Sequence, residues 1–321
     1  MERRSIVVTR RLPGVPWEEL AKRFRAGEAP PDGTMPREDL LARVAGASGI
    51  LCTLADRVDA ELMDAAGPSL AVVSNYAVGV NNVDIAGATR RGIRVCNTPD
   101  VLTDATADLG FALLLAAARK VSDADRFLRA GRWTGWDPWG FLGVPVAGKT
   151  LGIVGMGKIG SAVARRSRGF SMRILYHNRR RLPDAAEAEL GASYRGLDPL
   201  LSESDFVVLC VPLTAETRGL ISRDRIGRMK RTAVLVNIAR GEVVDESAAA
   251  AALAEGRLFA AGLDVFEKEP QVPQALLSAP SAVLLPHLGS ATGETREAMG
   301  RLATQNLLAV LDGREPPCPV N

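Results

Sequence analysis

Short β-branched runs alternate with alanine-rich amphipathic stretches along almost the whole chain, and this alternation restricts the fold more than any other feature. One series covers about the first hundred residues, and a second starts at Lys149 with runs roughly 25 to 30 residues apart. We expect strands at 5–9, 49–52, 71–74, 94–96, 150–154, 173–176, 206–211, 233–237, 259–263 and 282–285. Repeated βα units of this length form doubly wound parallel sheets with helices on both faces. The sequence therefore predicts an α/β protein with two such sheets.

Helices and one proline mark the seams between the two series. Pro99 interrupts the chain, and a long apolar helix is expected soon after it, at about 103–120. A last helix, at about 294–311, leads into a proline-rich tail. Shorter helices are expected at 36–45 and 59–66. The main seam between the two domains is thus expected near residue 100.

The composition is that of an ordinary globular protein, with 47% hydrophobic and 24% charged residues among 321. The 40 basic residues exceed the 37 acidic ones by too little to indicate a nucleic-acid or membrane surface. The four cysteines lie far apart without metal-ligand spacing. The N-terminus lacks the apolar core of a signal peptide, and the longest apolar stretch, 112–118, is far short of the about 20 residues that span a bilayer. We therefore expect a cytoplasmic protein with reduced thiols and no metal.

A glycine-rich loop follows the expected strand at 150–154, and an amphipathic stretch follows the loop. In this G-x-G-x-x-G pattern, Gly155 allows a tight turn, Gly157 lets the backbone approach a pyrophosphate, and Gly160 allows a helix to pack closely on the strand. Free N–H groups and the dipole at the helix N-terminus favour the bound anion. The pattern favours dinucleotide binding over a purely structural turn. The expected contacts are Gly155, Met156, Gly157, Lys158, Ile159 and Gly160.

The next expected strand ends in a basic turn at 177–181, with the sequence HNRRR. Proteins that prefer NAD place an acid near this point to bind the ribose 2′-hydroxyl, but here no acid occurs before Asp184. Asn178 is neutral, and three guanidinium groups suit a 2′-phosphate. We therefore expect Asn178, Arg179 and Arg180 to contact the cofactor, and NADPH to be preferred over NADH. A solvated basic turn is the structural alternative.

Three strand ends carry an arginine, a glutamate and a histidine. His287 is one of only two histidines and follows an expected strand, at the edge where open α/β sheets bind ligands, whereas a surface role is expected for His177. Arg240 and Glu269 follow two other strands. Arginine can hold a carboxylate and polarise a carbonyl, and histidine can donate a proton near neutral pH. A neighbouring carboxylate orients the histidine ring. These three groups are what reduction of a keto acid requires.

Six segments, taken together and in this order, are highly specific. They are 75–84 (NYAVGVNNVD), 106–111 (TADLGF), 155–160 (GMGKIG), 237–241 (NIARG), 262–270 (GLDVFEKEP) and 286–292 (PHLGSAT). With them the chain resembles the D-isomer-specific 2-hydroxyacid dehydrogenases along almost its whole length, particularly the glyoxylate/hydroxypyruvate reductases. The resemblance implies that a small 2-keto acid is reduced to a D-2-hydroxy acid with a nicotinamide cofactor.

The resemblance also implies roles for individual residues. Arg240 would bind and polarise the substrate, His287 would be the general acid/base, and Glu269 would be its carboxylate partner. Asp264 would hold the nicotinamide amide. Further cofactor contacts are implied at Thr106, Pro212, Thr217, Ile238 and Gly289. Substrate contacts are implied at Leu54, Val78 and Gly79, the last two through backbone N–H groups; a core leucine and a simple turn are the structural alternatives.

A discontinuous domain arrangement is implied as well. Residues 1–100 and 288–321 would form a flavodoxin-like substrate domain, and 101–287 would form an inserted Rossmann-type dinucleotide-binding domain. The substrate would bind in the cleft, and closure would exclude water.

The resemblance also implies a homodimer through the cofactor domain. The segment 131–143 fits this picture because it holds three of the four tryptophans, and aromatic residues favour interfaces. In glyoxylate reductases a tryptophan from such a segment can reach the partner's active site. The sequence does not distinguish Trp136 from Trp139 for this role.

Two departures and two alternatives complete the interpretation. Asn81 stands where many relatives carry aspartate, with no clear effect, and Glu269 stands where formate-oxidising relatives place glutamine, which argues against that activity. A reductase of a longer sugar acid such as 2-ketogluconate is the alternative within the class. A nucleotide-sensing corepressor is the alternative of another class, but the chain has no long disordered tail or added partner-binding domain.

Overall fold

The computed structural model of the chain contains two compact units, each described here by itself. The described residues are 3–27, 30, 33 and 35–321. Unit 1 comprises Met1–Leu102 and Ser290–Asn321, and unit 2 comprises Thr103–Gly289. The sequence prediction placed these limits at 100 and 288, and the functions that it attached to the two domains remain predictions.

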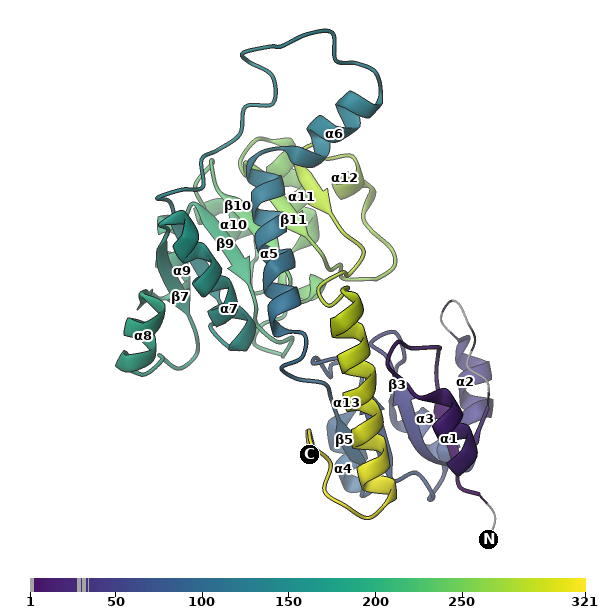
Figure 1. The fold of residues 1–321 in the computed structure, drawn as a ribbon. Helices are drawn as coiled ribbons and strands as arrows, with labels where there is room; N and C mark the ends of the chain where they lie inside the picture. The colour runs from purple at the N-terminus through teal and green to yellow at the C-terminus, as the bar shows by residue number, and fades with distance from the viewer. Residues whose placement is uncertain (1–2, 28–29, 31–32, 34) are drawn as a thin grey trace. The chain divides into compact units, whose positions relative to one another are not determined.

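Unit 1 is built on a parallel five-stranded sheet with the order β2-β1-β3-β4-β5 (Figure 1). Its strands are β1 Ser5–Val8, β2 Arg25–Ala26, β3 Ala47–Cys52, β4 Val72–Asn75 and β5 Arg94–Cys96. Every residue of β4 is buried, as expected of a parallel strand covered on both faces. The four predicted strands are confirmed, whereas β2 was missed because two residues are too few to show a period.

The helices of unit 1 include one from the far end of the chain. They are α1 Trp17–Arg23, α2 Arg37–Val44, α3 Ala60–Ala66, α4 Ile85–Arg90 and α13 Gly293–Leu311. Helix α13 packs against β3 and β4, and Leu307 on it is fully buried. The Ser74 hydroxyl in β4 donates to the Ala303 carbonyl in α13 (2.8 Å). Burial of this helix face makes unit 1 discontinuous in sequence.

Unit 2 is built on a parallel seven-stranded sheet with the order β12-β11-β10-β9-β6-β7-β8. Its strands are β6 Thr150–Val154, β7 Arg173–His177, β8 Ala192–Tyr194, β9 Phe206–Leu209, β10 Val234–Asn237, β11 Ala260–Leu263 and β12 Ala282–Leu284. The predicted strands are confirmed within about two residues at each end, and the three-residue β8 was missed. The strand order reverses between β6 and β9, which is the point where such sheets bind ligands.

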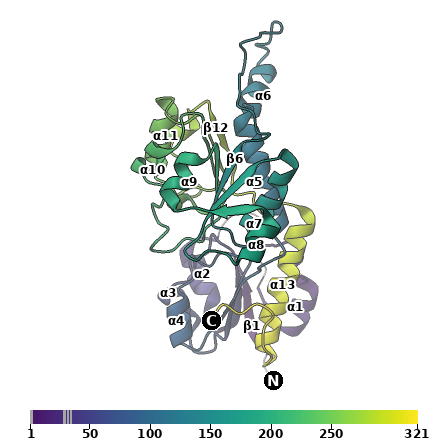
Figure 2. The same ribbon diagram turned by 90° about the vertical axis from the view of Figure 1, so that its left-hand side faces the viewer.

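Helices cover both faces of this second sheet (Figure 2). They are α5 Thr103–Ala118, α7 Lys158–Ser167, α8 Asp184–Leu190, α9 Leu197–Glu203, α10 Arg223–Arg228, α11 Glu246–Ala254 and α12 Gln274–Leu277. Alternate residues of β9 enter two separate apolar cores, Phe206 and Val208 on the side of α5 and α7, Val207 and Leu209 on the side of α9 to α11. The continuous apolar run of this strand is thus explained by burial on both faces.

Helix α6 (Val121–Arg129) and the residues after it form an exposed segment, residues 121–143, called the arm below. It projects from the rest of unit 2 (Figure 1). No residue of α6 is buried. The large apolar side chains of the arm that are exposed are Val121, Leu128, Trp133, Trp136, Trp139, Phe141 and Leu142. In the ranges that the structure describes, no helix has the length and apolar character of a membrane span.

Candidate active site

The glycine loop connects β6 to α7 with close backbone contacts at two of its three glycines. Gly155 has φ +100°, and a Cβ atom there would lie 2.8 Å from the backbone of Cys210 in the loop after β9. A Cβ atom on Gly160 would lie 2.2 Å from the Gly155 carbonyl oxygen. At Gly157, in contrast, no described atom beyond the glycine and its two chain neighbours lies within 4 Å of such a Cβ. The loop is therefore tightly packed at Gly155 and Gly160 but open at Gly157, which fits a pyrophosphate at the N-terminus of α7.

Asn178 comes directly after β7, and its side chain binds the glycine loop. The Met156 backbone N–H donates to Asn178 Oδ1 (2.7 Å), and Asn178 Nδ2 donates to the Met156 carbonyl (3.4 Å). The neutral amide that was predicted to contact the cofactor thus bridges the first turn of the loop. An aspartate could accept the same N–H but could not donate in return.

The basic turn divides its three arginines between two environments. Arg179 and Arg180 are exposed. Arg181 is exposed as well, but it donates through Nε and Nη2 to both carboxylate oxygens of Glu187 (2.9 and 2.7 Å). This pairing, together with the hydrogen bond from Tyr176, lowers the pKa of Glu187 to about 2. Arg181, which was not among the predicted cofactor contacts, is thus paired with an acid of α8, and the phosphate contacts of Arg179 and Arg180 stay predictions.

The other histidine, His177, lies at the end of β7. Its Nδ1 lies 3.0 Å from the Arg195 carbonyl, and its ring is tilted against Tyr194 with the ring centres 6.0 Å apart. These contacts hold the half-buried ring in place, and the surface role that was expected for this histidine stays a prediction.

The ends of β10, β11 and β12 bring the three predicted catalytic residues to one edge of unit 2. These strands are adjacent, with Asn237 paired to Leu263 and Leu263 to Leu284. Because the strands are parallel, the loops after them leave the sheet at the same side. Arg240 follows β10, Glu269 lies in the loop after β11, and His287 follows β12.

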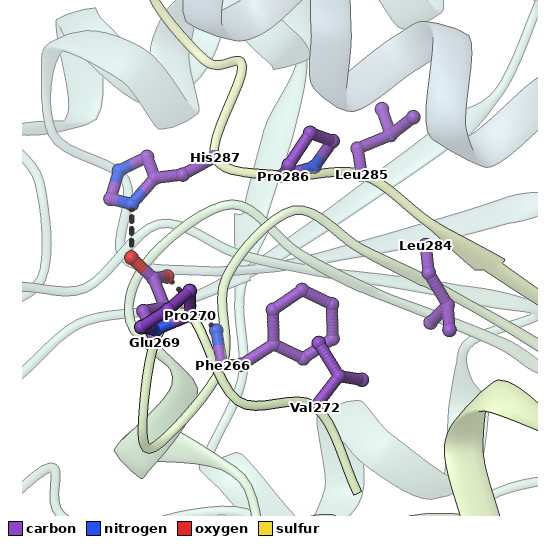
Figure 3. Close-up of a pocket in the computed structure, with 8 residues that line it drawn as sticks. All are labelled: Phe266, Glu269, Pro270, Val272, Leu284, Leu285, Pro286 and His287. Atoms are coloured by element: carbon purple, nitrogen blue, oxygen red, sulfur yellow. Dashed lines mark hydrogen bonds and ion pairs between the residues drawn. The ribbon is translucent and has the colours of Figure 1, made fainter. Parts of the chain in front are cut away.

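His287 and Glu269 form a hydrogen-bonded pair (Figure 3). His287 Nδ1 lies 2.9 Å from Glu269 Oε2, and the other ring nitrogen faces away from the carboxylate. Glu269 Oε1 also accepts the Phe266 backbone N–H (3.1 Å). Burial raises the pKa of Glu269, but the hydrogen bond and charge of His287 and the charge of Arg240 lower it, so that the pKa lies below its ordinary value. The carboxylate is therefore ionised near neutral pH and accepts the Nδ1 proton.

The backbone of His287 is held in the left-handed region, with φ +56°. Few residues other than glycine adopt it, so the surroundings must stabilise this turn. Asp264, at the end of β11, does so: its carboxylate oxygens accept the N–H groups of Leu288 (2.6 Å) and Gly289 (2.8 Å), and its carbonyl accepts that of His287 (2.8 Å). Burial raises the pKa of Asp264. Asp264 thus orients the His287 turn, and its predicted contact with nicotinamide stays a prediction.

Arg240 is held in a turn that Asn237 closes. Asn237 Nδ2 donates to the Arg240 carbonyl (2.8 Å), and Asn237 Oδ1 accepts the Ala239 N–H (3.0 Å). Burial lowers the pKa of Arg240, and the negative charges of Glu269 and Glu242 oppose this shift. The guanidinium of Arg240 therefore lies within electrostatic reach of the His287–Glu269 pair.

The remaining predicted cofactor residues of unit 2 lie on three elements. Thr106 in α5 is buried beside Gly289, where an added Cβ would lie 3.4 Å from the Thr106 methyl group. Ile238 is buried beside Gly110 of α5. In the loop after β9, the Thr217 hydroxyl donates to the Pro212 carbonyl (2.6 Å), so the two predicted residues close one turn.

A pocket of about 270 Å³ adjoins the His287–Glu269 pair (Figure 3). Its lining residues are Phe266, Glu269, Pro270, Val272, Leu284, Leu285, Pro286 and His287. Most of these side chains are apolar, so the pair lies at the edge of an apolar environment.

The predicted substrate residues of unit 1 lie on two loops. Leu54 is half-buried, and Val78 is exposed. The side-chain amides of Asn97 and Asn75 donate to the carbonyls of Val78 and Gly79 (2.8 Å each). These two bonds restrain the loop whose N–H groups are predicted to contact the substrate.

Sequence reasoning overlooked two residues that shape these loops. Asn75 was quoted only as part of a motif, although its amide holds Gly79. Glu246 was not considered, although it is only 6% exposed and contacts the loop of Glu269. An acid within the otherwise alanine-rich segment 246–254 was the available signal, because a buried acid needs a partner.

Comparison with known proteins identifies the family. Residues 111–289 match the model of the D-isomer specific 2-hydroxyacid dehydrogenase, NAD binding domain. A glyoxylate reductase of Thermococcus kodakarensis is 52% identical over 99% of this chain and 96% of its own length. The structure of the TT0316 protein from Thermus thermophilus superposes with a TM-score of 0.92 at 48% identity, over 99% of this chain and 100% of that one.

A further solved structure similar to this chain is that of an NADPH-dependent glyoxylate/hydroxypyruvate reductase from Sinorhizobium meliloti, in complex with NADP and malonate. Its TM-score is 0.87 at 37% identity, over 99% of this chain and 97% of that one. The predicted fold class of two parallel α/β sheets and the predicted family are both confirmed. The chain is thus an oxidoreductase that uses a nicotinamide cofactor, and it belongs to the D-isomer specific 2-hydroxyacid dehydrogenases.

Proposed function

We propose that this enzyme reduces glyoxylate or hydroxypyruvate to the D-2-hydroxy acid and prefers NADPH. The observation that carries the proposal is the His287–Glu269 pair, 2.9 Å apart, with the charge of Arg240 acting on Glu269. The names of the relatives from Thermococcus kodakarensis and Sinorhizobium meliloti support the substrate class.

The proton that the reaction consumes is assigned to His287. Because Glu269 is ionised, it accepts the Nδ1 proton, and the form of the ring that reacts is the imidazolium, which carries a second proton on Nε2. Nε2 gives its proton to the carbonyl oxygen of the substrate, and the ring is left neutral with its proton on Nδ1. The left-handed turn at His287 fixes the direction of that nitrogen. In the reverse direction the same Nε2 accepts the hydroxyl proton.

Arg240 is assigned to the substrate carboxylate and to the carbonyl oxygen on which negative charge develops. A partly buried guanidinium stabilises such charge more than one in water does. Leu54 and the N–H groups of Val78 and Gly79 are assigned to the substrate as well.

The open space at Gly157, at the N-terminus of α7, fits a dinucleotide, and Gly155 to Gly160 are assigned to its phosphates. When bound, the reduced nicotinamide supplies the hydride. Thr106, Pro212, Thr217, Ile238, Asp264 and Gly289 are assigned to the same ligand. Three features support the preference for NADPH: Arg179 and Arg180 are exposed, Asn178 is neutral, and no acid lies between the end of β7 and Asp184.

A homodimer through unit 2 is part of the proposal. The arm exposes Trp136 to 85% and Trp139 to 78%, and an apolar surface of this kind marks a protein interface. Sedimentation velocity should give the mass of a dimer, and substitution of the arm tryptophans by serine should shift it toward that of a monomer.

The experiment that tests the proposed function follows the loss of nicotinamide absorbance with glyoxylate, hydroxypyruvate and 2-ketogluconate, with NADPH and NADH run side by side. Rapid loss with the first two acids and NADPH is expected. Faster turnover with NADH would overturn the cofactor preference alone. A much higher kcat/KM for 2-ketogluconate would overturn the substrate, and absence of turnover with all three would overturn the reductase activity.

A further inference from the structure

Glu246 is a buried acid to which the proposed chemistry gives no task. It is the first residue of α11, after Asp245, whose side chain caps the helix by accepting the Ala248 N–H (2.9 Å). Helix capping is thus served without Glu246. Its side chain is nevertheless 6% exposed and accepts the backbone N–H of Glu267 at 2.7 Å. A buried carboxylate that binds a loop 21 residues away calls for a reason beyond helix formation.

The loop that it binds is the one that carries Glu269. Two consecutive N–H groups of this loop donate to two different carboxylates: that of Phe266 to Glu269, at 3.1 Å, and that of Glu267 to Glu246, at 2.7 Å. The first bond orients the carboxylate that faces His287, and the second ties the loop to α11. The loop is therefore held on both sides of the Phe266–Glu267 peptide.

The same peptide also contacts the turn after Arg240. A Cβ atom added to Gly241 would lie 1.9 Å from the Phe266 carbonyl carbon and 2.1 Å from the Glu267 nitrogen, so the two backbones are in direct contact. A glycine is required for this approach. The N–H that Glu246 accepts thus belongs to the peptide that contacts Gly241, the residue next to Arg240.

The electrostatics of Glu246 agree with a hydrogen-bonding role instead of a charge-pairing one. Burial raises its pKa, and the nearby charges of Glu267, Glu242 and Glu269 raise it further, against the effect of the Glu267 N–H. A carboxylate beside three other carboxylates does not serve as a charge partner, so its role is to accept a hydrogen bond. The oxygen of an amide side chain can accept the same bond.

We propose that Glu246 is a positioning residue. It holds the Phe266–Glu267 peptide against Gly241, so that the Glu269 carboxylate binds His287 at a fixed distance from Arg240. The proposal rests on the proposed function for the role of Glu269 and His287. Glu246 does not contact the reacting atoms and acts through the loop.

The test compares Glu246→Ala with Glu246→Gln, which keeps an oxygen that accepts the Glu267 N–H. Glu246→Ala should lower kcat about 10- to 100-fold, since small misplacements of reacting groups cost this much, with the Kd for NADPH changed less than about twofold. Glu246→Gln should retain kcat within about threefold. Hydrogen exchange of the peptide covering 264–270 should quicken in Glu246→Ala only. The matched control is Glu255→Ala, which removes an exposed acid at the other end of α11 and should change neither kcat nor the exchange rate.

A double-mutant cycle separates positioning from general stability. In the background of Glu269→Gln, removal of Glu246 should lower kcat less than about twofold, because its effect passes through Glu269. An equal loss in both backgrounds, an equal defect of the Gln and Ala variants, or unchanged exchange at 264–270 in Glu246→Ala would each overturn the inference. If Glu246→Ala does not fold, the kcat and the exchange rates of Glu246→Gln still test the inference. A Gln variant that folds but has a low kcat or fast exchange at 264–270 would overturn it.

Failure of the proposed function gives a different pattern. Full turnover in His287→Ala and Glu269→Gln, with faster exchange in Glu246→Ala, would remove the catalytic assignment and retain the loop contact. Loss of turnover in His287→Ala, with normal kcat and exchange in Glu246→Ala, would overturn the role of Glu246 alone.

Discussion

The glycine loop after β6 and the proposed catalytic edge, at the ends of β10, β11 and β12, are both strand ends of one sheet, but they are assembled differently. The glycine loop is six consecutive residues, and the His177 carbonyl and the Asn178 side chain, at the end of β7, accept the N–H groups of its first two residues. The catalytic edge joins Arg240, Glu269 and His287 from three loops, each held by a different residue: Asn237, Glu246 and Asp264. The loop depends on local backbone geometry, whereas the edge depends on contacts between loops far apart in sequence.

This difference predicts that substitutions in the two regions impair separate functions, nucleotide binding and the chemical step. A change in the glycine loop should weaken nucleotide binding without moving the acid–base pair. A change at the catalytic edge should slow the chemical step without loss of nucleotide affinity. The four predictions below, in order of decreasing effect, test this separation.

The largest effect is expected for His287→Ala, because it removes the proposed proton donor. We expect kcat to fall about 10²- to 10⁴-fold, with the Kd for NADPH changed little. Steady-state kinetics and nucleotide fluorescence titration measure the two quantities. The matched control is His177→Ala, the other histidine of unit 2, which should keep kcat within about twofold. A near-normal kcat for His287→Ala would remove this residue from the reaction.

The second effect concerns two glycines of one loop. Gly157 has φ −88°, and no described atom lies within 4 Å of an added Cβ, so Gly157→Ala should leave Tm within about 1 °C and raise the Kd for both nucleotides about 10-fold. Gly160→Ala should instead lower Tm by several degrees, roughly 1–3 kcal/mol of overpacking, because its Cβ meets the Gly155 carbonyl. Calorimetry distinguishes them, and an equal loss of Tm would contradict an open loop at Gly157.

The third effect is selective for one nucleotide. Arg179→Ala combined with Arg180→Ala should raise the KM for NADPH about 10-fold and that for NADH less than about twofold, because only NADPH carries the 2′-phosphate. Arg181→Ala is the control of equal charge change per residue; its guanidinium is bound to Glu187, so it should not alter the ratio of the two KM values. An equal change for both nucleotides in the double variant would mean that these arginines do not bind the 2′-phosphate.

The smallest effect is a pH dependence of stability at the catalytic edge. The pKa of Glu269 is lowered in the folded protein, so its contribution to stability is present above the pKa of an unfolded glutamate, about 4.3, and is lost as the pH falls through the lower folded value. The gap in unfolding free energy between the native protein and Glu269→Gln should therefore narrow below about pH 4.3. Urea unfolding at several pH values measures it, and a gap independent of pH would mean that the ionised carboxylate is not stabilised.

Much of the fold could be predicted because it depends on periodic burial. Strands β6 and β9 are continuous apolar runs since both faces of the sheet are covered, and a run of this kind is visible in sequence. The very short strands β2 and β8 were missed because they depend on hydrogen bonds to a neighbour more than on a pattern. The sequence also did not predict that Arg181 differs from the other two arginines of the basic turn, because it pairs with Glu187, an acid on the next helix.

The sequence by itself determined the doubly wound class and the glycine loop, because residue type and local spacing are enough for both, and it led to the proposal of Arg240, Glu269 and His287 as the catalytic residues. Only the tertiary structure decided how these groups are held. The left-handed turn at His287, the contact of Gly241 with the Phe266–Glu267 peptide and the bond from Glu267 to Glu246 all join segments from different strands. Such contacts exist only once the parallel strands are paired, and no local pattern encodes them.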